Sequence, residues 1–311
     1  MALQTDQRSA LHTMLCHTDP ACREQAMELL WALEPSERAD VLSSSPSLRR
    51  VRLQQMDLSG INLPGRDLGW SVMVGTRLAG ASMRHVFLRK AALTTVDLSK
   101  ADLHGADLRQ ATLTDVNLSG ASLKGAKFHN TRFERCDLRG LDLREIRAIG
   151  TRFIDCDLRG ADLSRARLVQ SSPGWSVFSG GTLQDARLHS ISASGISFDQ
   201  VTMTDANLDR AALRRALFRG VSLCGATLSG ADLISARLED ADLRWTDLTD
   251  ALLRGIDFRK SQLAGATLAG ADLRSANLCG VDLQFADLRG CRLARCRTDD
   301  ADLRGADLTP P

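Results

Sequence analysis

Apolar residues recur at every fifth position from Leu53 to Leu308, with Thr298 as the exception, and this register never shifts. Of the 52 positions in the series, 48 are Leu, Met or Phe. A period of five fits neither the 3.6-residue period of an α-helix nor the two-residue period of a plain strand. Each five-residue block is therefore predicted to be a structural unit of its own. We call the recurring apolar residue of each block its centre.

Large centre residues recur at a second, longer spacing of 20 residues. Phe178, Phe198 and Phe218 follow this spacing, and the segment 131–143 returns in similar form as the segment 151–163. Like residues fill a uniform interior best when they stack on one another. Four blocks are therefore predicted to form one four-sided coil. About 13 such coils, spaced by roughly 4.8 Å as paired strands are, would make a rod about 60 Å long.

Within a block, a small apolar residue usually lies two positions before the centre, and Asp, Asn, Thr or Ser often lies one position before it. The segments Ala-Asp-Leu-His-Gly at 101–105 and Ala-Asp-Leu-Arg-Ser at 271–275 show the pattern. These blocks resemble the pentapeptide-repeat family, whose motif is Ala-Asp/Asn-Leu-X-X, over about five-sixths of the chain. The resemblance implies an all-β solenoid, a right-handed quadrilateral β-helix of about 13 coils.

The first 50 residues carry helix signals instead of the repeat. Asp19 can cap a helix that begins at Pro20, and an apolar stripe runs through the segment 22–33. We also expect a shorter helix over about residues 5–17 and a turn from Ser36 to Ser43. The expected domains are an N-terminal helical cap, 1–50, and the pentapeptide-repeat β-helix, 51–311, whose first coil the cap would cover.

Two places in the repeat are expected to be irregular. Pro173 stands at a centre within a segment rich in turn residues, and proline lacks the N–H that a strand ladder uses. We therefore expect a distorted side or a bulged loop within 171–200. Arg66 stands at a position that should point inward, which predicts a second distortion near the start of the repeat.

Composition narrows the class of protein. Hydrophobic residues make up 43% of the 311 residues but aromatic residues only 4%, so the interior should be narrow and uniform. No run approaches the roughly 18 apolar residues of a membrane span, and the first residues lack the pattern of a secretion signal. A cytoplasmic chain whose eight cysteines are free thiols is expected.

Residues that could carry catalysis or bind a metal are scattered. The six histidines are scattered and no nucleophile, base and orienting group can be placed together, so we expect no enzyme, and no cofactor is implied. A zinc site near the N-terminus is an alternative, but its spacing fits no standard pattern; its members would be His12, Cys16, His17 and Cys22.

Two further patterns concern cysteines and carboxylates in the repeat. Cys136 and Cys156 occupy equivalent inward positions, which indicates buried thiols or, alternatively, a disulfide. Aspartates before a centre are expected to pair with arginines just after it, as at Asp137/Arg139 and Asp157/Arg159.

One side of the predicted coil carries a column of like charges one residue before the centre. Like charges stacked about 4.8 Å apart repel one another, so such a column is a candidate contact surface for an acidic partner. The alternative is that these arginines pair with Glu134, Asp155 or Asp157. Trp175 is a further candidate anchor for a partner. The basic candidates are Lys127, Arg147, Arg167 and Arg187, with Arg132 and Arg152 on the adjacent side.

The family resemblance also implies a DNA-mimicking function, because well-known members bind DNA gyrase or topoisomerase as rods that imitate duplex DNA and give resistance to topoisomerase poisons. A full mimic of this length would need roughly 35 negative charges. Residues 51–311 instead hold 35 Lys and Arg against 31 Asp and Glu, a net charge of +4. A single acidic side is the remaining form of mimicry. It comprises Asp102, Asp142, Asp162, Asp242, Asp282 and Asp302.

Leu303 and Leu308 keep the repeat pattern near the end of the sequence, and no capping helix follows them. An open last coil would expose apolar side chains and strand edges, so a homodimer through this end is expected. The pattern as a whole favours a non-catalytic protein-binding scaffold. The alternatives are a gyrase-binding or topoisomerase-binding DNA mimic and, second, a secreted bacterial effector or nucleic-acid-binding rod.

Overall fold

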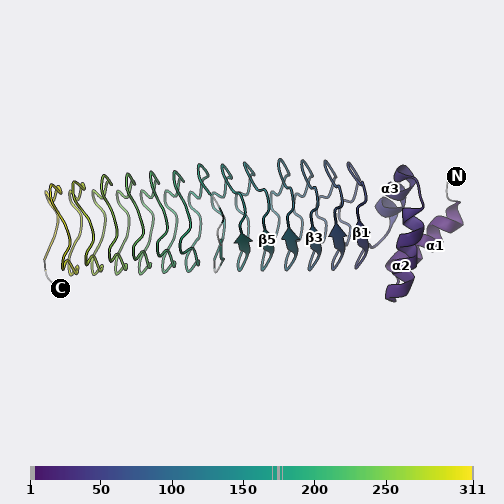
Figure 1. The fold of residues 1–311 in the computed structure, drawn as a ribbon, viewed down its shortest axis with the longest axis horizontal. Coiled ribbons are helices and arrows are strands. Elements are labelled where there is room, and N and C mark those ends of the chain that lie inside the picture. The colour runs from purple at the N-terminus through teal and green to yellow at the C-terminus, as the bar shows by residue number, and fades with distance from the viewer. Residues whose placement is uncertain (1–3, 170, 174–175, 177, 310–311) are drawn as a thin grey trace. The chain divides into compact units, whose positions relative to one another are not determined.

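The computed structural model describes residues 4–169, 171–173, 176 and 178–309 (Figure 1). The chain divides into two compact units, Met1–Asp142 and Leu143–Pro311, and each is described by itself. Within the described residues, no helix has both the length and the apolar character needed to cross a membrane.

Three helices begin the first unit: α1 (Thr5–Cys16), α2 (Pro20–Trp31) and α3 (Pro35–Ser44). Asp19 caps α2, because its side chain accepts a hydrogen bond of 3.0 Å from the Ala21 backbone N–H. The first two helices confirm the expectation from sequence. The turn expected from Ser36 to Ser43 is wrong, since these residues lie in α3.

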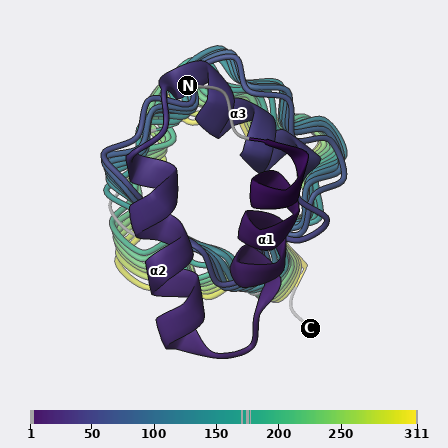
Figure 2. The same cartoon turned by 90° about the vertical axis from the view of Figure 1, so that its right-hand side faces the viewer.

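The physical reason for α3 is visible at both ends of its sequence. Pro35 stands at the first helical position, where its missing N–H costs nothing. Val41 and Leu42 are buried, and the buried Arg38 donates from Nε to the Leu30 carbonyl oxygen at 3.0 Å. The hydrogen bonds of Arg38 to the last residues of α2 therefore stabilise a helix whose serine-rich sequence suggests a turn. Figure 2 shows α1 and α2 lying across the end of the first coils of this unit.

The first unit continues with short parallel strands on one side of successive coils. In their middle positions, Leu53, Met73, Leu93, Leu113 and Phe133 are buried and lie in register, each 20 residues after the last. The strands pair in chain order: β1 (Arg52–Gln54), β2 (Val72–Val74), β3 (Ala92–Thr94), β4 (Thr112–Thr114) and β5 (Arg132–Glu134).

The other sides of the coils are held by single bridges and repeated turns. In the first unit, the Leu58 N–H donates to the Arg77 carbonyl oxygen of the next coil at 2.8 Å, and the Ile61 N–H closes a turn onto Leu58 at 3.1 Å. The second unit, which contains β6 (Arg152–Ile154), repeats both bonds, with Leu228 bonded to Asp247. Both units are therefore parallel β-solenoids with four five-residue sides per coil.

Three-residue strands form on fewer coils than the number of coils expected from the sequence. Three-residue strands occur on five successive coils of the first unit, which is fewer than the 13 coils expected from sequence. Elsewhere a single residue of each block, the one before the centre, makes the bridge to the next coil. A five-residue block leaves little length for a strand between its turns, so most of the ladder consists of isolated bridges.

The described residues of 171–200 keep the coil pattern. The Ser172 N–H donates to the Thr151 carbonyl oxygen at 3.0 Å, and the Ser192 N–H donates to Ser171 at 3.1 Å. Pro173 is buried and borders an apolar cavity of about 20 Å³. The expected distortion is therefore wrong for these residues, because proline at a centre removes only one bond between coils.

Arg66 does not distort its coil either. Its backbone accepts the normal bond, 2.9 Å, from the Phe87 N–H of the next coil. The half-buried side chain donates from Nε to the Ser43 carbonyl oxygen in α3 at 3.0 Å. An arginine fits this position because the neighbouring helix supplies an acceptor.

Candidate functional site

Eight of the carboxylates that precede a centre are each bound by the arginine two residues later. In each pair the Asp Oδ1 accepts the backbone N–H of the arginine, and Nε and Nη2 of the same arginine bind the two carboxylate oxygens. The pairs predicted at Asp137/Arg139 and Asp157/Arg159 are confirmed, with Nη2–Oδ2 distances of 2.7 and 2.5 Å. The same pair forms at Asp107/Arg109, Asp242/Arg244, Asp257/Arg259, Asp272/Arg274, Asp287/Arg289 and Asp302/Arg304.

This pairing changes the electrostatics of the acidic side. The hydrogen bonds from Arg244 hold the pKa of the Asp242 carboxyl below its usual value. Arg304 lowers the pKa of Asp302 in the same way. These aspartates stay ionised, but each presents a neutralised pair to a partner.

The acidic side predicted from sequence is therefore neither continuous nor strongly negative. In the first unit, Asp102 is bound by Arg84 at 3.0 Å, and Asp142 is exposed. In the second unit, Asp162 lies 3.8 Å from Arg144, whereas Asp282 accepts the Gln284 backbone N–H. The bridges of this ladder place uncharged residues between the carboxylates, namely Thr182, Thr202, Ser222 and Gln262.

The basic column behaves differently. In the second unit, backbone bridges join Arg147 to Arg167 and Arg167 to Arg187, so the three lie on successive coils. We call these three residues the arginine ladder. Within the described parts of the chain, no carboxylate lies within 4.0 Å of their guanidinium groups. Arg167 Nε is buried and has no hydrogen-bond partner among those residues.

Two carboxylates that stand two residues before members of the arginine ladder contact a different arginine. Arg165 lies 3.8 Å from Glu145 and 3.8 Å from Asp185. Arg152, in β6, is exposed and bridges to Ser172 on its own side of the coil. Lys127 belongs to the first unit, where it is exposed and bridges to Asp107. The second unit therefore retains a basic surface that its own acids do not cancel.

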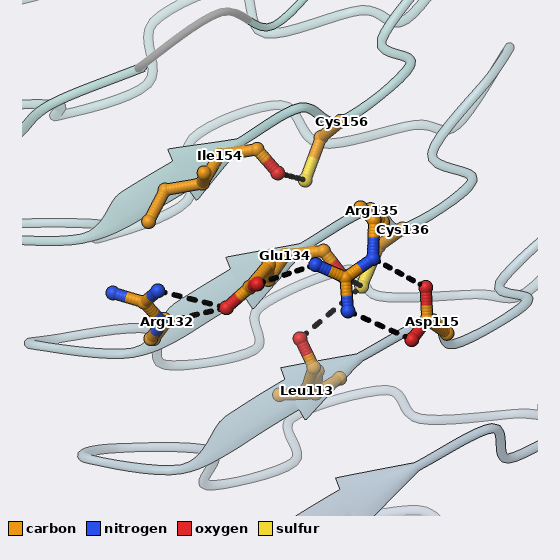
Figure 3. Close-up of polar contacts among 8 residues, drawn as sticks. All are labelled: Leu113, Asp115, Arg132, Glu134, Arg135, Cys136, Ile154 and Cys156. Atoms are coloured by element: carbon orange, nitrogen blue, oxygen red, sulfur yellow. Dashed lines mark hydrogen bonds and ion pairs between the residues drawn. The ribbon is translucent and has the colours of Figure 1, made fainter.

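Arg132 is paired, as the alternative from sequence proposed. Its Nε and Nη2 donate to Glu134 Oε2 at 3.1 and 2.8 Å. Figure 3 shows Arg135 continuing this network to Asp115, one coil earlier, through bonds of 2.7 and 2.9 Å. Arg132 and Arg135 lower the pKa of the Glu134 carboxyl, so the network stays ionised. This part of the surface is neutral.

The residues considered for zinc serve the helices instead. His12 Nε2 lies 3.2 Å from Ser44 Oγ, and the Cys16 thiol donates to the Ser47 carbonyl oxygen at 3.2 Å. His17 Nδ1 accepts the Asp19 backbone N–H, whereas Cys22 is half-buried. Across the described ranges, no group of three or more metal-binding side chains is present.

The remaining candidates differ in their surroundings. All eight cysteines are free thiols, as expected, and Cys136 and Cys156 are buried. Figure 3 shows the Cys136 thiol directed at the Leu113 carbonyl oxygen, 3.4 Å away. Leu303 is half-buried and Leu308 is 49% exposed, so the dimer through them stays a prediction. Trp175 lies outside the described residues.

Two exposed aromatic side chains, Phe87 and Phe285, are features that sequence reasoning missed, whereas the outward positions of Trp70 and Trp245 follow from the repeat. Phe87 is 47% exposed at the position before a centre, where this chain usually has a polar residue. Trp70 lies nearby in the same pocket, and Lys90 Nζ is 4.2 Å from its ring centroid. In the second unit, Trp245 and Phe285 are exposed two coils apart. The apolar residue at a normally polar position is the signal that identifies Phe87.

Similar solved structures are repeat proteins of one kind. The chain is 28% identical to HetL, a pentapeptide repeat protein involved in heterocyst differentiation regulation from the cyanobacterium Nostoc sp. strain PCC 7120, over 83% of this chain and 90% of HetL, with a TM-score of 0.39. A thylakoid lumen pentapeptide repeat protein from Arabidopsis thaliana is 36% identical, over 32% of this chain and 68% of its own, with a TM-score of 0.31. No curated protein sequence matches the chain.

A third similar structure is QnrB1, a plasmid-mediated fluoroquinolone resistance protein. It is 23% identical over 68% of this chain and 89% of QnrB1, with a TM-score of 0.25. The sequence profile of the pentapeptide repeats matches in 8 copies, over residues 101–140, 136–172, 183–220, 216–255, 256–295 and 286–309. Since these copies cover more than half of the chain, the chain belongs to the pentapeptide repeat family.

Proposed function

We propose that this chain is a non-catalytic scaffold that binds an acidic protein partner through the arginine ladder of its second unit. One observation carries the proposal: Arg147, Arg167 and Arg187 stack on successive coils without a carboxylate of the described chain in reach. Stacked like charges are destabilising in the free protein. An acidic partner relieves this repulsion on binding, which favours complex formation.

The surrounding surface supports this assignment. Eight arginines of the repeat are fully engaged by the aspartate two residues before them. Paired groups of this kind contribute little to attraction at a distance. The arginine ladder therefore stands out as a local positive surface on a chain whose net charge is only +2. Association should be salt-sensitive, since exposed charges are screened.

Charge reversal tests the proposal. The full chain and its Arg147→Glu/Arg167→Glu variant are used as bait in the native lysate, and captured proteins are identified by mass spectrometry. Arg210→Glu/Arg215→Glu is the matched control, because both arginines are exposed in the second unit and the net charge changes equally. A captured acidic protein that is lost with the first variant and retained with the control supports the proposal. Equal capture by all three baits contradicts it.

DNA mimicry is the alternative function, as the resemblance to the pentapeptide-repeat family implies. The likeness to QnrB1, at 23% identity, concerns the fold alone. At least four of the six aspartates on the acidic side have an arginine within 4.0 Å, which weakens imitation of a phosphate backbone. Inhibition of gyrase supercoiling by the purified chain would favour mimicry over the scaffold. Cytoplasmic localisation remains a prediction, and cell fractionation distinguishes it from secretion as an effector.

A further inference from the structure

A pocket in the first unit, separate from the arginine ladder, combines exposed aromatic rings with several cations. It has a volume of about 340 Å³. We call it the Trp70 pocket. The lining residues that matter below are Arg49, Asp67, Trp70, Phe87, Arg89 and Lys90.

The two aromatic side chains do not contribute to the interior of the coil. Trp70 is 41% exposed and Phe87 is 47% exposed. Phe87 lies on the ladder between Asp67 and Asp107, with which its backbone makes bridges. Exposed rings of this size lose the stabilisation that burial would give. A partner that covers both rings recovers it.

Three side chains form a stacked column beside the pocket. Arg50, Trp70 and Lys90 occupy the same left-handed position of successive coils, with φ values of 64°, 62° and 60°. Lys90 Nζ lies 4.2 Å from the centroid of the Trp70 ring, and Arg50 Cζ lies 5.8 Å from it. These cation–π contacts hold the ring and both cations at the surface in one arrangement.

The pocket has more cations than its single acid can neutralise. Asp67 lies 3.8 Å from Arg49 and accepts the Gly69 backbone N–H at 2.8 Å. For Arg50, Arg89 and Lys90, the described chain offers no carboxylate within 4.0 Å. Three positive groups therefore surround two exposed rings.

We propose that the Trp70 pocket binds an acidic segment of a protein partner. A large apolar side chain of the segment packs against Phe87 and the edge of Trp70, and neighbouring carboxylates bind Lys90 and Arg89. Charge complementarity determines the class of partner, and the buried apolar residue supplies the anchor. The pocket lies in the first unit, so this proposal stands apart from the function proposed for the arginine ladder.

A single-stranded nucleic acid fits the pocket less well. Stacking of a base needs an open aromatic face. Lys90 and Arg50 already lie over the Trp70 ring and occupy that surface. Peptide carboxylates do not need the face of the ring, because they can bind the solvent-exposed N–H groups of Lys90 and Arg50.

Selection from a random peptide library displayed on phage tests the pocket directly. The full chain is the bait, and the Trp70→Ser/Lys90→Glu variant serves for counter-selection. Serine suits position 70, since Ser190, Ser235 and Ser275 adopt the same left-handed conformation. Enriched peptides should carry at least two Asp or Glu beside a large apolar residue. Trp70→Ser alone and Lys90→Glu alone should each weaken the binding of these peptides at least tenfold, as measured by fluorescence anisotropy.

Two control variants show whether a loss of binding is specific to the Trp70 pocket or follows from removing any exposed tryptophan or reversing any exposed lysine. Trp245→Ser removes an exposed tryptophan at φ 61°, and Lys100→Glu reverses an exposed lysine at φ 57°. Both should bind the selected peptides as tightly as the unmodified chain. Failure to enrich any peptide, enrichment of peptides without acidic residues, or equal loss with the control variants overturns the proposal. Tighter binding of a single-stranded oligonucleotide that Trp70→Ser abolishes also overturns it.

Discussion

Arg66 Nε donates a hydrogen bond of 3.0 Å to the Ser43 carbonyl oxygen and thereby joins the first coils to α3. The position of Arg66 in its block is one that usually holds a small apolar residue facing the interior. The side chain is half-buried, and its charged group reaches an acceptor near the C-terminal end of a helix. A cation at this end is also favoured by the helix dipole.

The first prediction concerns this bond. Arg66→Ala should lower the free energy of unfolding by about 1.5–3 kcal/mol, as expected for a hydrogen bond from a charged donor. Amide exchange should accelerate in α3, because the helix loses its anchor to the coil. Denaturation with urea and hydrogen exchange measure the two effects. Unchanged exchange in α3 would show that the bond does not hold the helix.

The sequence alone was sufficient for the repeat, because nearly all centre side chains fill the same narrow interior. Leu93 and Leu113, for example, occupy equivalent buried positions, so the spacing of apolar residues reports the fold directly. It was insufficient for α3, whose formation depends on burial of Arg38 against the carbonyl oxygens of α2. The contact of Arg66 with Ser43 depends on the same packing between segments.

The candidate surfaces were predicted less completely. Their spacing of 20 residues placed Arg147, Arg167 and Arg187 in one column, because this prediction requires only the number of residues in a coil. It could not show that Arg132 is neutralised by Glu134, because this depends on side-chain orientation. The Trp70 pocket was missed for a similar reason. Its members come from different positions of the block and meet only when the coils stack.

The second prediction concerns a glycine covered by an aromatic ring. A Cβ at Gly265 would collide with the Trp245 ring, whereas a Cβ at Gly280 would have nothing within 4 Å. Both glycines have similar positive φ values, 68° and 66°. Each change to Ala should cost about 1–2 kcal/mol for the left-handed conformation. Gly265→Ala should cost more, because the Trp245 ring must also move.

A double-mutant cycle isolates that additional cost. In a Trp245→Ala background, Gly265→Ala and Gly280→Ala should destabilise the chain equally in urea denaturation. A difference between the two glycine variants that persists without the ring would contradict the role of Trp245.

The third prediction concerns Asp272, whose carboxylate is almost fully buried. Arg274 binds it at 2.7 and 2.6 Å, and Arg254 lies 3.5 Å away. These bonds hold the pKa of Asp272 well below its usual value. Its contribution to stability should be complete above the ordinary pKa of about 3.9 and should be lost as the pH falls through the lowered value.

Asp272→Asn should therefore destabilise the chain by about 1.5–3 kcal/mol at neutral pH, and the difference should shrink in acid. Urea denaturation across a pH series measures this. Asp242→Asn provides a graded comparison, since Arg244 is the one arginine of the described residues that binds Asp242, and Asp242 is less buried. Its effect should be smaller. A constant difference between Asp272→Asn and the unmodified chain at all pH values would contradict the linkage.

The fourth prediction concerns the reactivity of Cys291. Burial raises the pKa of its thiol to about 11, and Sγ donates to the Leu268 carbonyl oxygen at 3.0 Å. Because the thiolate is the reactive form, a pKa two units above the ordinary value of 9.0 lowers the reactive fraction about 100-fold near neutral pH. Iodoacetamide should therefore label Cys291 much more slowly than the exposed Cys16. Peptide mass spectrometry after timed quenching measures both rates. In denaturant the two cysteines should react alike, since unfolding removes the desolvation that raises the pKa of Cys291; equal rates in the native protein would show that its thiol is not protected.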